Sequence, residues 1–128
     1  MRMAGETLLE AAAAALAAVE GIGRVYDSPP LQAALPHALV SIDLESDWSH
    51  KGSEGREVRL AASLYDKGER PLRLRRLAGA AEAALGAVAG EAEGWRVVTM
   101  RYLRTRIVRD KDHWAAVIEF RARLLAVR

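Results

Sequence analysis

Two long runs of residues in the last third of the sequence are rich in strand-forming side chains, and a short polar turn separates them. In the second run, residues 114–127, apolar residues alternate with charged ones. The apolar positions are Trp114, Ala116, Ile118, Phe120, Ala122 and Leu124, and the positions between them include Glu119, Arg121 and Arg123. Successive side chains of a β-strand point to opposite faces of its sheet, so this pattern predicts a strand with one buried face. With Asp110-Lys111-Asp112 as the turn and residues 95–109 as the first run, the chain is predicted to contain a long C-terminal β-hairpin.

The alternation in the first run of this hairpin has one interruption. Val98, Met100 and Tyr102 share one parity, whereas Leu103 and Ile107 fall on the other. A β-bulge adds one residue to one strand of a pair and would restore the alternation. We therefore expect a bulge or a local twist near Leu103.

Two other stretches have the period of an amphipathic helix. Thr7-Leu8-Leu9-Glu10 has the form of a capping box, so a helix is expected to begin there and to stop at Gly21. Pro71 suits the first turn of a second helix, which should continue to Gly90. The apolar positions at helical spacing are Leu8, Leu9, Ala12, Leu16 and Val19 in the first helix, and Leu74, Leu77, Ala81, Ala84, Leu85 and Val88 in the second.

The second helix is unusual because its first residues are basic. Arg70, Arg73, Arg75 and Arg76 lie at the end where the helix dipole disfavours positive charge. A solvated face accounts for most such clusters. The alternative is that a group outside the helix binds some of these arginines.

Two shorter alternating stretches complete the predicted elements. Val40, Ile42 and Leu44 should share one face of a strand, and a second strand follows over residues 57–64. The predicted order is helix, strand, strand, helix, strand, strand. It indicates one α+β domain over residues 1–128, in which an antiparallel four-stranded sheet carries both helices on its apolar face.

The hairpin is predicted to extend beyond the helices that cover the sheet. Residues 95–109 span about 50 Å as a strand at ~3.3 Å per residue. The first helix, with about sixteen residues at ~1.5 Å each, covers only about 24 Å. The overhang holds a few apolar residues and many arginines, which favours contact with another chain.

Charge is distributed unevenly along a chain whose formal net charge is +2. Residues 95–128 contain nine basic and three acidic residues, whereas residues 43–57 contain five acidic and two basic ones. Two complementary patches on one chain favour head-to-tail contacts, and such contacts can close into rings. The candidate interface comprises Arg101, Arg104, Arg106, Arg109, Arg121 and Arg123 on the hairpin, and Asp47, Trp48, Glu54 and Glu57 on the acidic segment. A nucleic-acid surface built from the same arginines is the alternative.

No pattern in the sequence predicts catalysis or a cofactor. The chain has no cysteine, and His37, His50 and His113 lack the spacing of metal ligands. No run is apolar enough for a membrane span, and Glu6 and Glu10 stand where a secretory signal needs basic residues. The expected protein is cytoplasmic, with no catalytic residues, metal site or cofactor.

Several strings, in order, resemble a family of small phage and gene-transfer-agent proteins similar to tail terminators and tail completion proteins. The resemblance covers nearly the whole chain. It rests on Arg24-Val25-Tyr26-Asp27, Pro29-Pro30, Leu35-Pro36, Asp47-Trp48-Ser49, residues 55–65, Arg106-Ile107-Val108-Arg109-Asp110 and Ile118-Glu119-Phe120-Arg121-Ala122. Two departures are His37, where an aromatic residue is expected, and the lack of a glycine after Asp110.

The resemblance implies a non-enzymatic virion protein at the junction of head and tail. Such a protein would be assembled in the cytoplasm and would form a ring, typically a hexamer, that caps the tail tube. Its implied partners are further copies of itself, the tail tube protein and the head connector or stopper, with DNA able to pass through the lumen. A head-completion or stopper protein of the same junction is the alternative role.

Overall fold

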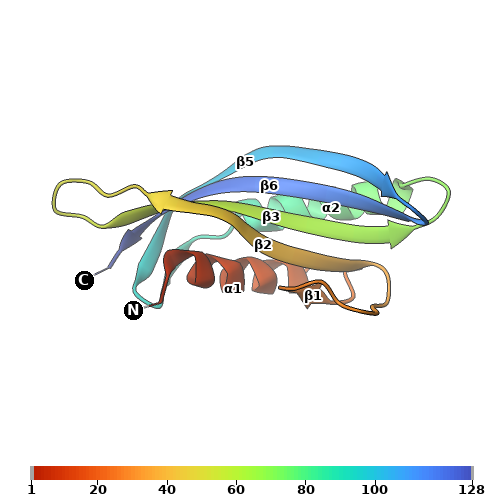
Figure 1. Ribbon diagram of the computed structural model, residues 1–128, viewed down its shortest axis with the longest axis horizontal. Helices are drawn as coiled ribbons and strands as arrows, with labels where there is room; N and C mark the ends of the chain where they lie inside the picture. Colours follow the sequence, from red (N-terminus) through yellow and green to blue (C-terminus); the bar gives the residue numbers. More distant parts are fainter. Residues whose placement is uncertain (1, 128) are drawn as a thin grey trace.

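Six strands form one mixed sheet, and two helices pack on one of its faces (Figure 1). The computed structural model describes residues 2–127. The elements are α1 (Ala4–Ala17), β1 (Val25–Tyr26), β2 (His37–Asp47), β3 (Gly55–Lys67), α2 (Leu72–Gly86), β4 (Gly90–Ala92), β5 (Trp95–Asp110) and β6 (His113–Ala126). Across the sheet the order is β1-β2-β3-β6-β5-β4. The first pair is parallel and the others are antiparallel.

The prediction of a four-stranded antiparallel sheet is therefore wrong, because two short strands were missed. β1 pairs in parallel with β2 through Val25 and Tyr26, and β4 pairs with the start of β5. Strands of two or three residues are too short to show alternation. The glycine of Glu93-Gly94 was a signal in the sequence for the turn between β4 and β5, because tight hairpin turns need residues with positive φ. In the structure Glu93 and Gly94 have φ values of 52° and 86°.

The core lies between the helices and the face of the sheet that β3 and β6 present to them. Phe120, Leu60 and Leu64 are essentially inaccessible to solvent, as are Leu8 and Leu16 of α1. The other fully buried large side chains are Leu74, Leu85, Ile118, Leu124, Val40 and Val58. The predicted alternation in β6 is thus confirmed. Among residues 2–127, no helix is long and apolar enough to cross a membrane.

The start of α1 corrects the predicted capping box. The helix begins at Ala4, so Thr7 lies inside it, buried, and its hydroxyl has no hydrogen-bond partner within residues 2–127. A carboxylate from β2 serves the helix end instead, because the backbone N–H of Gly5 donates to Glu45 Oε1 at 3.1 Å. Both helices also end earlier than predicted, at Ala17 and Gly86 rather than at Gly21 and Gly90.

Bulges determine which residues face the core. The pairing of β5 with β6 shifts between Tyr102 and Arg104, which confirms the bulge expected near Leu103. Two further shifts were not predicted, one in β5 between Val97 and Thr99, where Val98 is 43% exposed, and one in β2 between Ile42 and Leu44. The shift in β2 moves Leu44 to the opposite face, where the residue is 60% exposed, so the prediction that Leu44 shares the buried face is wrong.

The predicted overhang of the hairpin is confined to one strand. β6 lies between β3 and β5, and its helix-facing side chains are buried. β5 is exposed along most of its length, with only Trp95 buried. Figure 1 shows β5 and β6 extending past α1 and alongside α2.

An ion pair fixes the first turn of α2 to the end of β3. Arg73 Nε donates to Asp66 Oδ2 at 2.8 Å, and a second guanidinium nitrogen donates to Oδ1 at 2.6 Å. The backbone N–H of Lys67 donates to Oδ1 at 2.9 Å. Asp66 is 2% exposed, and the hydrogen bond from Arg73 is the main cause that lowers its pKa. One arginine of the basic helix start therefore has a partner outside the helix.

Replacing this carboxylate by its neutral isostere should destabilise the fold. We expect Asp66→Asn to lower the free energy of unfolding by about 1–3 kcal/mol at neutral pH, because Arg73 loses a charged acceptor. The folded-state pKa of Asp66 lies below its ordinary value of 3.8. The contribution is therefore complete above that value and is lost as the pH falls through the folded-state pKa. Urea denaturation of the wild type and of Asp66→Asn, at neutral pH and at about pH 2, measures this difference in the free energy of unfolding.

Asp27→Asn is the matched control for this measurement. Asp27 is exposed and forms no ion pair within residues 2–127. Its replacement should leave the unfolding free energy nearly unchanged. A loss at Asp66→Asn that is equally large in acid would contradict the ion-pair explanation.

The turn between β5 and β6 offers a second test of stability. Asp110 pairs with His113, so Lys111 and Asp112 form the loop, and Lys111 has a φ of 56°. A side chain is unfavourable at this φ, so Lys111→Gly should raise the free energy of unfolding by about 0.5–1 kcal/mol. Asp112→Gly, at a position without positive φ, should lower it. Urea denaturation of the two variants should therefore give shifts of opposite sign; shifts of the same sign would be inconsistent with strain at Lys111.

Candidate assembly interface

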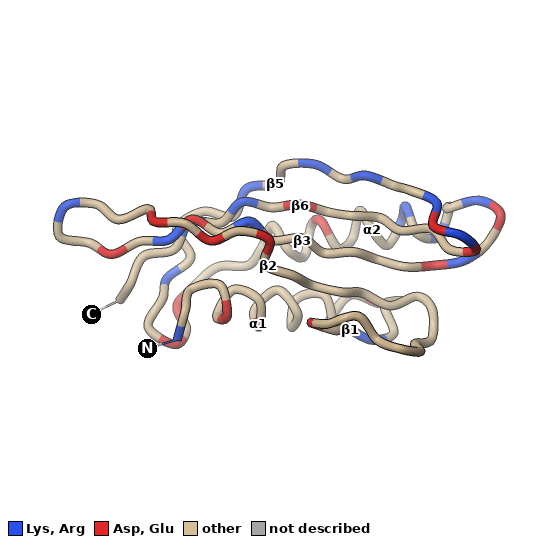
Figure 2. Tube along the Cα trace, viewed as in Figure 1, with Lys and Arg blue, Asp and Glu red and all other residues tan. Residues whose placement is uncertain are grey.

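The face of the sheet opposite the helices carries most of the arginines of β5 and β6. The strand pairings arrange its side chains in rows that cross β2, β3, β6 and β5. One row contains Leu44, Arg59, Arg121 and Arg101. We call this surface the open face; its arginines are Arg59, Arg96, Arg101, Arg104, Arg106, Arg121 and Arg123. Figure 2 shows basic residues repeated along β5.

Two glutamates on the open face pair with three of these arginines. Arg123 Nε donates to Glu57 Oε1 at 3.0 Å, and Arg121 Nε lies 3.8 Å from the same oxygen. Arg104 forms a hydrogen-bonded ion pair with Glu119, which lowers the pKa of the glutamate and raises that of the arginine. These five residues therefore have partners within the chain.

The other four arginines of the open face, Arg59, Arg96, Arg101 and Arg106, form no ion pair with any residue of the described range 2–127. All four are exposed. Arg59 and Arg101 lie in the same row as Arg121, so like charges face one another on adjacent strands, which is unfavourable. An anionic group from outside the chain would relieve this repulsion.

Arg109 is separated from the other predicted interface arginines. It pairs with Trp114 at the far end of the hairpin, on the helix side of the sheet. Its guanidinium carbon lies 5.0 Å from the centroid of the Trp114 ring, within the range of a cation–π contact.

Arg59 of β3 belongs to the open face but was not among the predicted residues. Its position next to the buried Leu60 was the signal for it.

The acidic segment, residues 43–57, comprises the end of β2, the loop of residues 48–54 and the start of β3, at one end of the molecule. The Arg123 guanidinium lies 5.2 Å from the centroid of the Trp48 ring, so the loop contacts the open face of its own chain. Asp47 accepts a hydrogen bond from Ser49 Oγ at 2.6 Å, and this bond is the main cause that lowers its pKa. Asp47 is exposed and Glu54 is half-buried. Of the predicted residues, the structure thus brings Trp48, Glu57 and Arg123 together within one molecule.

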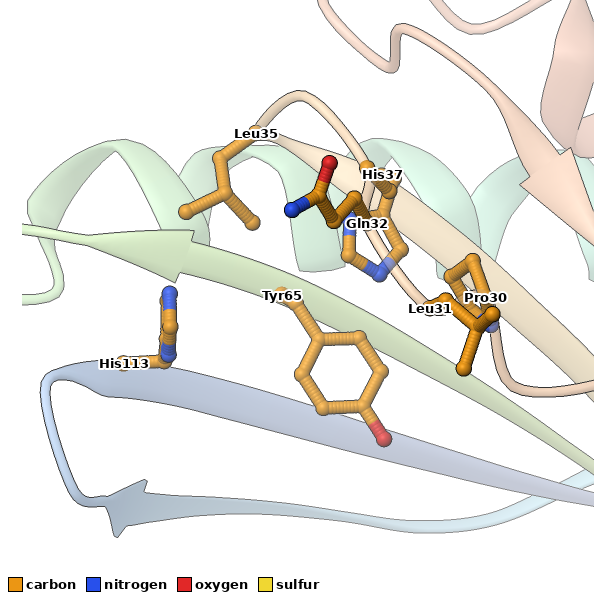
Figure 3. A pocket seen from close by; sticks show the side chains of 8 residues that line it. Pro30, Leu31, Gln32, Leu35, His37, Tyr65 and His113 are labelled. Atoms are coloured by element: carbon orange, nitrogen blue, oxygen red, sulfur yellow. The ribbon is translucent and has the colours of Figure 1, made fainter.

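A shallow cavity of about 340 Å³ lies at the other end of the sheet, beneath the proline-rich loop. His37, Tyr65 and His113 line it from three strands, and the loop contributes Pro30, Leu31, Gln32, Ala33 and Leu35 (Figure 3). The rings of His37 and Tyr65 stack with centroids 5.1 Å apart. Within residues 2–127 no group of three His, Cys, Asp or Glu residues is arranged to hold a metal ion.

Comparisons with known proteins agree with the sequence resemblance. A family model described as tail completion protein gp17 matches residues 7–125. A chain of a solved structure titled "Virion of native gene transfer agent (GTA) particle" is similar, with 26% identity and a TM-score of 0.64. The match covers 94% of this chain and 91% of that chain. Among curated proteins there is no significant match. The resemblance predicted from the sequence is confirmed.

Proposed function

Because this chain belongs to the family of tail completion protein gp17, we propose that it is the tail terminator at the head–tail junction of a phage or gene transfer agent particle. The family match spans nearly the whole chain. The structural neighbour is itself part of a gene transfer agent virion. A tail completion protein is a structural component of the particle, and the proposed role involves no enzymatic turnover.

The observation that carries the proposal is the open face with its unpaired cations. Arg59, Arg96, Arg101 and Arg106 form no ion pair within residues 2–127, although the charges of Arg59 and Arg106 help to lower the pKa of Glu119. A neighbouring subunit or the tail tube protein would supply the missing anionic groups. Copies related by rotation would close into a ring, for which we propose six subunits.

The ring would act through its shape. One side would meet the last ring of the tail tube and stop its growth, and the other would meet the head connector or stopper protein. DNA would pass through the lumen. The proposed contact residues are those predicted from the sequence, of which Arg101 and Arg106 are the hairpin arginines that keep a free charge on the open face.

Removing the gene from a producing strain tests the terminator role directly. Without a terminator, tail tubes should grow beyond their normal length and should remain separate from heads, because nothing caps them. Electron microscopy of the lysate measures both the tube length and the fraction of heads with tails. Supplying the gene from a plasmid is the control and should restore joined particles.

The same experiment separates the terminator from a head-completion or stopper protein. Loss of a stopper should leave tails of normal length that fail to attach to heads. Tails of normal length in the deletion strain would therefore contradict the terminator role and would support the alternative.

Charge reversal on the open face tests the proposed contact. Arg101→Glu combined with Arg106→Glu should reduce the yield of joined particles at least about tenfold, which corresponds to a loss of ~1.4 kcal/mol in association. Plasmid complementation of the deletion strain measures this yield. Arg75→Glu combined with Arg76→Glu is the matched control, because both residues are exposed on α2, away from the open face.

Circular dichroism of the purified variants should show an unchanged fold, since all four side chains are exposed. Equal yields from the two double variants would count against the open face as a contact surface.

The nucleic-acid alternative makes a different prediction for the same proteins. Affinity of the wild-type chain for duplex DNA should then fall steeply with salt and should disappear in the Arg101/Arg106 variant.

A further inference from the structure

Both edges of the sheet are largely unpaired. β1 covers the outer edge of β2 only at Ala38 and Leu39, and β4 covers the outer edge of β5 only from Trp95 to Val97. Beyond these points, within residues 2–127, neither the rest of β2 nor β5 from residue 99 to 110 has a strand on its outer side. Such an edge presents free backbone N–H and C=O groups that another strand can bind.

The open edge of β2 borders a groove along α1. Two adjoining cavities of about 370 Å³ each share Glu6, Leu9 and Asp27 in their lining. Ile42 and Ala13 add apolar surface, and Glu45 adds a carboxylate, of which Oε2 is buried without a hydrogen-bond partner within residues 2–127. The groove is therefore apolar along its floor, and its rim carries the carboxylates of Glu6, Glu10, Asp27 and Glu45 together with Arg2, which pairs with Glu6 and Glu10.

The open edge of β5 carries apolar side chains on the side that would face this groove. Its helix-side positions include Met100 and Tyr102, and Tyr102 remains 40% exposed although its ring contacts Phe120. Arg101 and Arg106 lie on the opposite, open face of β5, so they would remain on the open face of a joined sheet and would not enter the groove. The match between this edge and the groove is therefore apolar, with backbone groups of both edges free to pair.

Strand direction and level are also compatible with pairing. β2 with β3, β3 with β6, and β6 with β5 are each antiparallel, so β5 runs opposite to β2. A second copy rotated about an axis along the strands would place its β5 antiparallel to β2. Leu44 and Arg101 lie in the same row, so the unpaired parts of the two edges overlap at the same level.

We propose that β5 of one copy pairs antiparallel with the outer edge of β2 of the next copy, which joins their sheets into one continuous sheet. Met100 and Tyr102 of the added strand then lie over the groove beside α1. The open faces of successive copies stay on the same side of the assembly. This inference rests on the proposed ring, because a head-to-tail contact of this kind must close to satisfy every edge.

The absence of cysteine from the natural sequence makes covalent trapping a direct test. Leu44→Cys is combined with a cysteine at Thr99, Arg101 or Arg104, which covers three neighbouring positions on the same face of β5. Particles that carry each double variant as their only copy are purified under reducing conditions and are then oxidised. Non-reducing electrophoresis should show a ladder of covalent oligomers for at least one pair.

Leu44→Cys with Arg75→Cys on α2 is the matched control and should remain monomeric on the same gel. Particles that contain the double variants but give no ladder at any of the three positions would overturn the strand pairing, while the terminator role would stand. If purified wild-type particles lack the protein altogether, the proposed function fails and the pairing fails with it. Joined particles recovered before oxidation show that the cysteine variants fold and assemble.

Discussion

The contact between the alternating apolar side chains of β3 and β6 and the two helices holds the molecule together. Leu60, Ile118 and Phe120 are buried in this layer. Because the side chains of a strand alternate, burying these residues directs Arg59 and Arg121 to the opposite face. Formation of the core and formation of the cationic open face are therefore one event, and no sequence with this alternation could form one without the other.

The open face is only partly neutralised by its own chain, and this balance suits an assembling protein. Glu57 and Glu119 form ion pairs with three of its arginines, and four others, Arg59, Arg96, Arg101 and Arg106, form none within residues 2–127. The side chains of Glu57, Glu119, Arg121 and Arg123 are half-buried, so these pairs form part of the packed surface.

Features that depend on local alternation could be predicted from the sequence, and features that depend on long-range pairing could not. The buried face of β6 and the bulge near Leu103 follow from parity alone. The start of α1 does not, because its N-terminal partner, Glu45, is 40 residues away along the chain. Likewise Glu57 meets Arg123 across 66 residues, so the sequence showed two complementary patches without indicating that they touch within one molecule. The misplaced face of Leu44 arose from a single bulge that leaves no mark on the apolar pattern.

The three tryptophans occupy environments that would respond to different events. Trp95 is 3% exposed, and its indole N–H donates to the Arg2 carbonyl at 2.8 Å, so its emission should change only when the core opens. Trp48 and Trp114 are half-buried beneath arginine guanidinium groups near opposite ends of the sheet. Intrinsic fluorescence of single-tryptophan proteins would thus distinguish unfolding from the covering of either end, without any attached dye.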